Sequence, residues 1–287
     1  MNTLKINNVS LVYSNGYQAL NGLNLEITNG IFGLLGPNGA GKSSLMKTIV
    51  GLQKPSGGTI TFNDVDIVEN PLEIQKHLGF LPQYFDVYPK VSAYHLLEHL
   101  AKLKGINQPK ELKVQILNLL EKVNLLEARH KEVHTFSGGM KQRFGVAQAL
   151  LGSPKIVIVD EPTAGLDPEE RNRLNTLLSG LSEDMIIILS THLVEDVRNL
   201  CSTMAIMKQG SLRIQGKPKD FINQLQGKLW SKAVEKDDIP TLESTHKVIN
   251  KQLVERVMHL TVLADKCPDG FSAVTPTLEH VYFTHLS

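Results

Sequence analysis

The sequence predicts an α/β domain that is interrupted by a helical insertion and followed by a small α+β appendage. In residues 1–216, apolar runs of strand length alternate with helical patterns, and one run leads straight into a glycine-rich loop. Between about residues 84 and 152 the pattern becomes helical, and after residue 216 it changes to short alternating segments. These observations predict a main domain at 1–216 and an accessory region at 217–287.

The composition is that of an ordinary globular protein. Of the 287 residues, 41% are hydrophobic and 21% are charged, and the net charge of +1 gives no bias toward nucleic acid or anionic lipid. No apolar run approaches the roughly 18 residues that a membrane span needs, and the N-terminus lacks the apolar core of a signal peptide. The two cysteines, Cys201 and Cys267, have no paired spacing, which predicts reduced thiols in a cytosolic protein.

The first third of the chain is expected to consist mainly of strands. The segments that alternate or cluster like strands are residues 4–13, 20–28, 31–35, 59–62 and 79–83. A helix is expected at about 42–51, where the glycine- and proline-rich segment "GLQKPSGG" ends it.

The middle of the chain is expected to be helical, and strand–helix alternation then returns. "AYHLLEHLAKL", "LKVQILNLLEKVNLL" and "GMKQRFGVAQALLG" carry apolar residues three and four apart. "IVIVD" and "MIIILS" are continuous apolar runs typical of buried parallel strands. Helices at 168–181 and 193–200 and a hairpin at 203–216 complete the predicted domain.

The last sixty or so residues hold too many apolar residues to remain a solvated tail. Thr277 is the expected N-cap of a short last helix whose apolar positions are Leu278, Val281, Tyr282 and Leu286. We therefore expect residues 226–287 to fold as a small α+β unit.

A phosphate-binding loop is the strongest functional signal. "GPNGAGKS" at residues 36–43 fits the pattern G-x-x-x-x-G-K-[ST], with a strand before it and a helix after it. Lys42 would meet the β- and γ-phosphates of a nucleotide, and the hydroxyl of Ser43 can ligate Mg²⁺. The sequence therefore predicts a P-loop NTPase core that takes ATP and Mg²⁺. The expected nucleotide-binding residues in this loop are Gly36, Asn38, Gly39, Ala40, Gly41, Lys42, Ser43 and Ser44.

Two carboxylates and a second anion-binding helix start accompany this loop. Asp160 and Glu161 follow a buried strand, at the edge where open α/β sheets bind their ligands. Asp160 is the expected Mg²⁺ ligand, and Glu161 is expected to polarise a water that attacks the γ-phosphate. In "HTFSGGMKQR" (134–143), Ser137 and two glycines open a basic helix, which is suited to holding an anion.

The motifs "GPNGAGKSS", "LPQ", "FSGGMKQR", "IVIVDEPTAGLDP" and "STH" occur in this order and spacing. The chain thereby resembles the ATP-binding subunit of an ABC transporter over residues 1 to about 216. The resemblance implies an antiparallel β subdomain beside the core. It also implies that two such subunits close head to tail on two ATP molecules, with Ser137, Gly138 and Gly139 of one subunit touching the γ-phosphate held by the other.

The resemblance assigns roles to four further residues. Tyr13 resembles the aromatic residue that stacks on adenine, with Tyr17 as a weaker candidate. Gln83 resembles the glutamine that meets Mg²⁺ and the attacking water, and Asp167 resembles a residue of the loop that crosses the dimer interface. His192 is expected to hydrogen-bond the γ-phosphate and to steady Glu161. The candidate catalytic residues are Lys42, Gln83, Glu161 and His192, and the candidate metal ligands are Ser43, Gln83 and Asp160.

The sequence departs from the common signature L-S-G-G-Q of this family at two positions. Phe136 replaces the leucine and Met140 replaces the glutamine. Methionine is only a weak hydrogen-bond acceptor, so a polar role at this position is not expected.

Two functions remain as alternatives at this point. The first is an ATPase subunit at the cytoplasmic face of the membrane, paired with an integral membrane permease and with a second copy of itself or a homologous subunit. The second is a soluble ABC-type ATPase that acts on nucleic acid or ribosomes. A single set of motifs, the lack of sustained heptads and the near-neutral charge favour the transporter, and no nucleic acid partner is expected. A P-loop kinase or GTPase would explain neither "FSGGMKQR" nor the helical insertion.

Two segments point to the permease. "PTLEHVYFTHL" resembles the P-T-L-E-x-[VA]-F ending of subunits paired with export-type permeases, such as those for drugs, lipids and polysaccharides. Residues 83–100 mix aromatic and apolar side chains, and their aromatic residues Tyr84, Phe85 and Tyr88 are expected to dock a permease helix.

Overall fold

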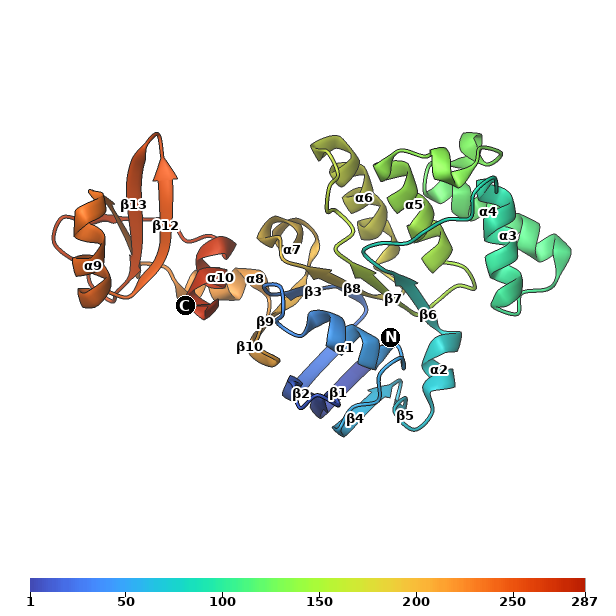
Figure 1. Cartoon of the computed structure of the whole chain (residues 1–287), viewed down its shortest axis with the longest axis horizontal. Coiled ribbons are helices and arrows are strands. Elements are labelled where there is room, and N and C mark those ends of the chain that lie inside the picture. The colour runs from blue at the N-terminus through green and yellow to red at the C-terminus, as the bar shows by residue number, and fades with distance from the viewer. Residues whose placement is uncertain (287) are drawn as a thin grey trace. The chain divides into compact units, whose positions relative to one another are not determined.

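The computed structural model describes residues 1–286 of the chain (Figure 1). The described chain forms two compact units, and the division falls between Leu212 and Arg213. Among residues 1–286, no helix is both long enough and apolar enough to cross a membrane.

The first unit begins with a four-stranded antiparallel sheet in the order β2-β1-β4-β5. Its strands are β1 (Thr3–Val12), β2 (Gln18–Thr28), β4 (Gly57–Phe62) and β5 (Val65–Asp66). Leu4 and Ile6 point into the core at alternate positions, as side chains of a strand do. The register then shifts at Asn8, whose φ of 50° is left-handed, so that Val9 is also buried. This bulge keeps the apolar face of β1 on the core.

A second sheet of six strands, in the order β10-β9-β3-β8-β7-β6, forms the centre of the first unit, and its edge strand β10 begins there and continues past the division at residue 212. Its strands are β3 (Gly30–Leu35), β6 (Leu78–Leu81), β7 (Ile156–Asp160), β8 (Ile186–Thr191), β9 (Thr203–Lys208) and β10 (Ser211–Gly216). The pairs of β3 with β8 and of β7 with β8 are parallel, and Leu35 pairs with Thr191 and Asp160 with Ser190. The carboxyl ends of these three strands therefore meet at one edge of the sheet, where α/β folds bind their ligands.

Four helices follow strands or turns of the first unit. They are α1 (Lys42–Ile49), α2 (Pro71–Lys76), α6 (Pro168–Leu181) and α7 (Val194–Leu200). α1 ends two residues before the expected position. The reason is that Gly51 adopts a φ of 76°, and its N–H bonds to the Thr48 carbonyl 3.2 Å away, which closes the last turn.

The helical insertion gathers beside β6 (Figure 1). It contains α3 (Ala93–Leu103), α4 (Pro109–Lys122), the short 3₁₀ helices η1 (Leu126–Ala128) and η2 (Val133–Thr135), and α5 (Gly138–Ala149). Ser92 caps α3 and Ser137 caps α5, each by accepting a backbone N–H three residues on. Lys104 donates to the carbonyls of Leu78 and Leu151, which ties the end of α3 to the sheet.

The second unit is a small α+β fold around a four-stranded sheet in the order β12-β13-β11-β14. Its elements are α8 (Pro218–Gln224), β11 (Leu229–Val234), η3 (Lys236–Asp238), α9 (Ile239–Thr245), β12 (Val248–Val254), β13 (Val257–Leu263), β14 (Ser272–Ala273) and α10 (Leu278–Leu286). α10 packs on α8 and β12 and buries Val281 and Tyr282 there. The apolar face of this last helix thus finds its partners within its own unit. The hydroxyl of Thr277 lies 3.1 Å from Nδ1 of His280 at the start of α10.

Candidate functional site

A cavity of about 220 Å³ lies at the edge where β3 and β7 end. Residues 37–44 of the glycine loop form one wall, and Gln83, Asp160 and Glu161 come from the ends of neighbouring segments. A larger cavity of about 770 Å³ lies along α4, but none of the predicted site residues is among the described residues that line it. The loop residues, Gln83 and the two carboxylates predicted from the sequence therefore meet at the smaller cavity.

The glycine loop needs glycine for steric reasons at two positions. A Cβ atom on Gly36 would lie 2.5 Å from the carbonyl oxygen of Met207, and one on Gly41 would lie 2.8 Å from that of Ala19. Gly41 also adopts a φ of 103° at the N-cap of α1, a conformation that other residues rarely reach. The close contacts wrap the loop tightly over the start of α1, so that free backbone N–H groups are available to phosphate oxygens.

Lys42 is the buried cation of the cavity. Its side chain stands at the first position of α1, and its Nζ donates to the carbonyls of Gly36 at 2.6 Å and Pro37 at 3.3 Å. Burial lowers the pKa of Lys42, and the negative charges of Glu161 and Asp160 partly offset that effect. A poorly solvated ammonium group beside two carboxylates is suited to binding the phosphates of a nucleotide.

Asp160 ends β7 on the same side of the cavity. Burial raises the pKa of Asp160 above its usual value, and the neighbouring charge of Glu161 raises it further. A cation bound at this carboxylate would relieve both effects, because it stabilises the ionised form.

Glu161 and His192 form a close pair across the ends of β7 and β8. Nδ1 of His192 lies 2.7 Å from Oε2 of Glu161, whose residue is 8% exposed. The backbone of Glu161 has a φ of 47°, and its N–H donates to the carbonyl of Ser190 at 2.8 Å. Such a left-handed conformation in a residue other than glycine is strained and occurs often at functional sites. The turn aims the Glu161 carboxylate into the cavity instead of along the strand.

Of the two aromatic candidates, the structure places Tyr17 rather than Tyr13 among the residues that line the cavity. The ring of Tyr13 stacks on that of Tyr17, with centroids 6.5 Å apart and planes 7° from parallel. The hydroxyl of Tyr13 lies 3.0 Å from that of Ser44, in the first turn of α1. Tyr13 therefore supports Tyr17 against the loop, and Tyr17 is the ring that faces the cavity.

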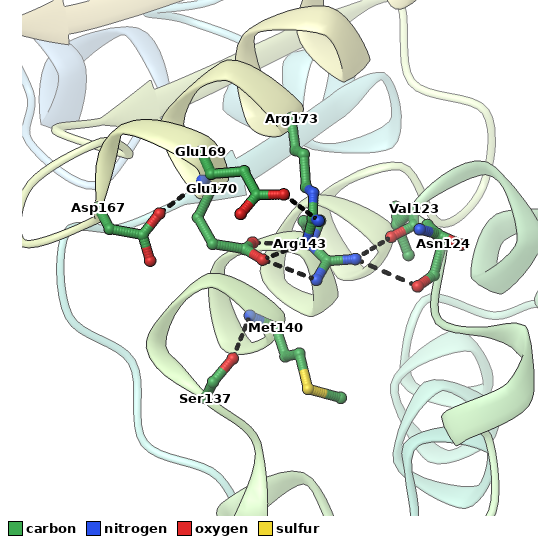
Figure 2. Close-up of polar contacts among 9 residues, drawn as sticks. All are labelled: Val123, Asn124, Ser137, Met140, Arg143, Asp167, Glu169, Glu170 and Arg173. Carbon is green, nitrogen blue, oxygen red and sulfur yellow. Dashed lines mark hydrogen bonds and ion pairs between the residues drawn. The ribbon is translucent and has the colours of Figure 1, made fainter.

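The second segment predicted to bind an anion, residues 137–139, is not part of this cavity. Ser137 is exposed at the start of α5, and its Oγ accepts the backbone N–H of Met140 at 3.2 Å (Figure 2). Asp167 begins α6 in the same way and accepts the N–H of Glu170 at 2.8 Å. Phe136, which replaces the leucine of the common signature, is buried, and its ring lies nearly perpendicular to that of Phe144. Of the two loops predicted to bind anions, only residues 37–44 thus line this cavity.

The structure also shows a buried polar contact that the sequence analysis missed. Oδ2 of Asp196, which is fully buried, accepts the hydroxyls of Thr163 at 2.6 Å and Thr191 at 3.1 Å. These bonds tie the loop after Glu161 to the strand end before His192. An acidic residue in the first turn of a helix is ordinary, so no sequence signal distinguishes Asp196 from its exposed neighbour Glu195.

Comparison with known families matches residues 20–164 to the family described as "ABC transporter". The linearmycin resistance ATP-binding protein LnrL of Bacillus subtilis is 36% identical over 197 residues, which cover 68% of this chain and 63% of that protein. The methionine import ATP-binding protein MetN of Helicobacter pylori is 34% identical, over 76% of this chain and 68% of that protein. The Nod factor export ATP-binding protein I of Rhizobium etli is 33% identical, over 79% of this chain and 72% of that protein. The chain thus spans less than two thirds of the length of the first of these relatives.

Two solved structures share the fold of this chain. The cbiO1 protein of Clostridium perfringens, part of the ABC transporter complex cbiONQ, matches with a TM-score of 0.69 at 29% identity, over 84% of this chain and 94% of that one. The ATP-binding cassette MJ0796, in a dimeric post-hydrolysis state bound to ADP and Pi, matches with a TM-score of 0.67 at 26% identity, over 75% of this chain and 98% of that one. These likenesses confirm the predicted P-loop core with its antiparallel and helical subdomains.

Proposed function

The chain belongs to the family of ATP-binding domains of ABC transporters, and from this premise we propose that it hydrolyses ATP to drive transport through a separate membrane permease. One observation carries the proposal. The phosphate loop, Asp160 and Glu161 surround one cavity, and His192 reaches Glu161 at its edge. Phosphoryl transfer needs positioning and charge neutralisation more than covalent chemistry, and these residues supply both.

Each residue has a distinct task in this reaction. Lys42 neutralises negative charge on the phosphates, and Glu161 accepts a hydrogen bond from the water that attacks the γ-phosphate. His192 holds the Glu161 carboxylate in place from the end of the neighbouring strand. Tyr17, backed by Tyr13, offers its ring to the adenine.

Ser43, Gln83 and Asp160 fit a Mg²⁺ ion. All three line the cavity, and their hydroxyl, amide and carboxylate oxygens are the kind of ligand that Mg²⁺ prefers. When bound, Mg²⁺ supplies further neutralisation of the phosphate charges. Among the described residues there is no group of three or more His, Cys, Asp or Glu that could hold a metal ion.

Residues 137–139 complete the site of a second subunit. They lie outside the cavity of their own chain, so the ATP in that cavity needs the corresponding residues of a partner. The dimeric state of the similar cassette MJ0796 supports this arrangement. Each chain of the dimer then uses both anion-binding loops, but on different ATP molecules.

Mixing two inactive variants tests the shared site. Lys42→Ala and Ser137→Arg chains should each be nearly inactive alone. In a heterodimer, one site carries both lesions and the other carries neither, so part of the ATPase activity should return. If verified heterodimers stay inactive while a heterodimer of wild-type and Lys42→Ala chains turns over, the shared site is rejected.

We place the protein at the cytoplasmic face of the membrane, held there by an export-type permease. The ending "PTLEHVYF" and the names of the resistance and export relatives support export, whereas the methionine relative is named for import. The names of these relatives describe transport or resistance rather than action on nucleic acid or ribosomes. The permease that copurifies with the full chain from membranes decides the direction. An importer or a ribosome in its place would contradict the proposal.

A further inference from the structure

A buried ion pair joins the two helices that begin with the exposed residues Ser137 and Asp167 (Figure 2). Nε of Arg143, on α5, lies 3.3 Å from Oε2 of Glu170, on α6, and the side chains are 8% and 16% exposed. Nη2 of Arg143 also donates to Oε1 of Glu170 at 3.5 Å. The pair thus connects the second turn of α5 with the first turn of α6.

The remaining donors of Arg143 tie this pair to a third helix. Nη1 donates to the carbonyls of Val123 at 3.2 Å and Asn124 at 3.1 Å, directly after α4 (Figure 2). The last carbonyls of a helix have no N–H donor within the helix, and here the guanidinium donates to two carbonyls at this helix end. Because the planar fork of arginine fits several acceptors at once, a lysine could not make the same set of contacts.

Glu170 has two further polar partners. Its backbone N–H is bound by Asp167, and its carboxylate also accepts Nη1 of Arg173 at 2.8 Å. Its side chain crosses the first turn of α5 directly above Gly139. A Cβ atom on Gly139 would lie 2.2 Å from Oε2 and 2.6 Å from Cγ of Glu170.

The two glycines of residues 137–139 therefore differ. The position of a Cβ on Gly138 is almost open, with Cδ2 of Leu166 as its nearest neighbour at 4.0 Å. Gly138 is free for an approaching ligand, whereas the space at Gly139 is already filled by Glu170 of the same chain. The glycine at 139 is needed inside its own subunit.

We infer that Arg143 and Glu170 are positioning residues that fix residues 137–139 and Asp167 in one geometry, so that both meet the partner's ATP together. This inference rests on the shared site proposed above. A ligand gains affinity from groups held in place before it binds, because their ordering costs nothing on binding. Without the pair, α5 and α6 would each present their first residue separately.

The test uses full-length heterodimers in which only one of the two sites can bind ATP. One chain keeps Lys42, and the other carries Lys42→Ala, so that the intact phosphate loop of the first is completed by residues 137–139 of the second. All chains carry Glu161→Gln to keep ATP unhydrolysed, and the apparent affinity for ATP is measured. Glu170→Gln is placed either in the chain with Lys42→Ala or in its partner.

The inference predicts an asymmetric result. When Glu170→Gln is placed in the chain that supplies residues 137–139, ATP binding at the intact site should weaken roughly tenfold. When it is placed in the other chain, ATP binding at that site should be unchanged. A loss of general stability would weaken binding in both arrangements, so an equal effect, or no effect, overturns the inference. Arg143→Lys, which keeps the charge but loses the fork, should repeat the asymmetry and serves if Glu170→Gln fails to fold.

Two controls separate this inference from the proposed function. Glu169→Gln makes the same chemical change at the neighbouring residue, whose ion pair with Arg173 is exposed, and should have no effect in either chain. Ser137→Arg should show the asymmetry most strongly. If Ser137→Arg shows the asymmetry and neither Glu170→Gln nor Arg143→Lys does, the positioning role is rejected and the shared site stands. If Ser137→Arg shows no asymmetry, the shared site fails and the inference falls with it.

Discussion

His192 and Glu161 meet at 2.7 Å, although they follow different strands and lie 31 positions apart in the sequence. Their contact exists because β7 and β8 are parallel neighbours whose ends coincide. The imidazole reaches the carboxylate that faces the phosphate loop, so a change at His192 acts on the orientation of Glu161.

Removing the imidazole should slow hydrolysis more than it weakens ATP binding. We expect His192→Ala to lower kcat by about 100-fold, the usual effect of losing one preorganised partner, with a smaller change in ATP affinity. Glu161→Gln should retain ATP and accumulate the ATP-bound dimer, which gel filtration detects. His99→Ala changes an exposed histidine of α3 and should leave kcat unchanged. Equal effects of the two histidine changes would contradict the role of the pair.

Asp160 should lower the stability of the nucleotide-free protein at neutral pH. Because the pKa of Asp160 is raised in the folded protein, the folded state holds this proton more tightly than the unfolded chain does, and stability is lost as pH rises through the raised pKa. Asp160→Asn should therefore raise Tm at pH 7, and the gain should shrink as the pH falls toward the ordinary pKa of 3.8. The same change should weaken Mg²⁺-dependent ATP binding. Asp184→Asn, at an exposed aspartate, should change neither; a Tm that falls for Asp160→Asn at pH 7 would refute the burial argument.

The glycines at 138 and 139 should respond differently to alanine. Gly139→Ala places a methyl group against Glu170 and should reduce the free energy of unfolding by about 1–3 kcal/mol, the usual cost of overpacking. Gly138→Ala meets open space and should be close to neutral in stability, although it should impair ATP-dependent dimerisation. Urea unfolding of the nucleotide-free chains measures the difference. Two variants of equal stability would show that Glu170 moves aside without cost.

Substitutions in the aromatic segment after Gln83 should distinguish the coupling of ATP hydrolysis to transport from the stability of the fold. Tyr84 and Tyr88 are 83% and 64% exposed, whereas Phe85 is half-buried, with ring atoms 2.9 Å from the position of a Cβ on Gly145. Tyr84→Ala and Tyr88→Ala should reduce transport but not basal ATPase activity. Phe85→Ala should also lower Tm, because its ring packs on α5. Unchanged transport in a Tyr84→Ala, Tyr88→Ala double variant places the permease contact elsewhere.

Short-range patterns account for most elements of this fold. The apolar runs at 156–160 and 186–191 form the central strands, and α6 spans 168–181 as expected, because strand and helix periodicities are local properties. α8 was missed because its seven residues bury no side chain and leave little periodicity. The glycine loop before α1 was predicted for the same local reason, since glycine spacing encodes a backbone shape directly.

The sequence by itself thus determined the glycine loop before α1, the acidic strand end and the alternation of strands and helices. The family resemblance implied that His192 acts on Glu161, and the structure places the two side chains 2.7 Å apart. Only the tertiary structure decided that Arg143 meets Glu170 and that Tyr17 rather than Tyr13 lies in the cavity wall. The physical reason is that strand order, helix packing and buried ion pairs depend on how the whole core is filled. Arg143 and Glu170 lie 27 positions apart, and the residues around each of them in the sequence do not show that the two side chains meet.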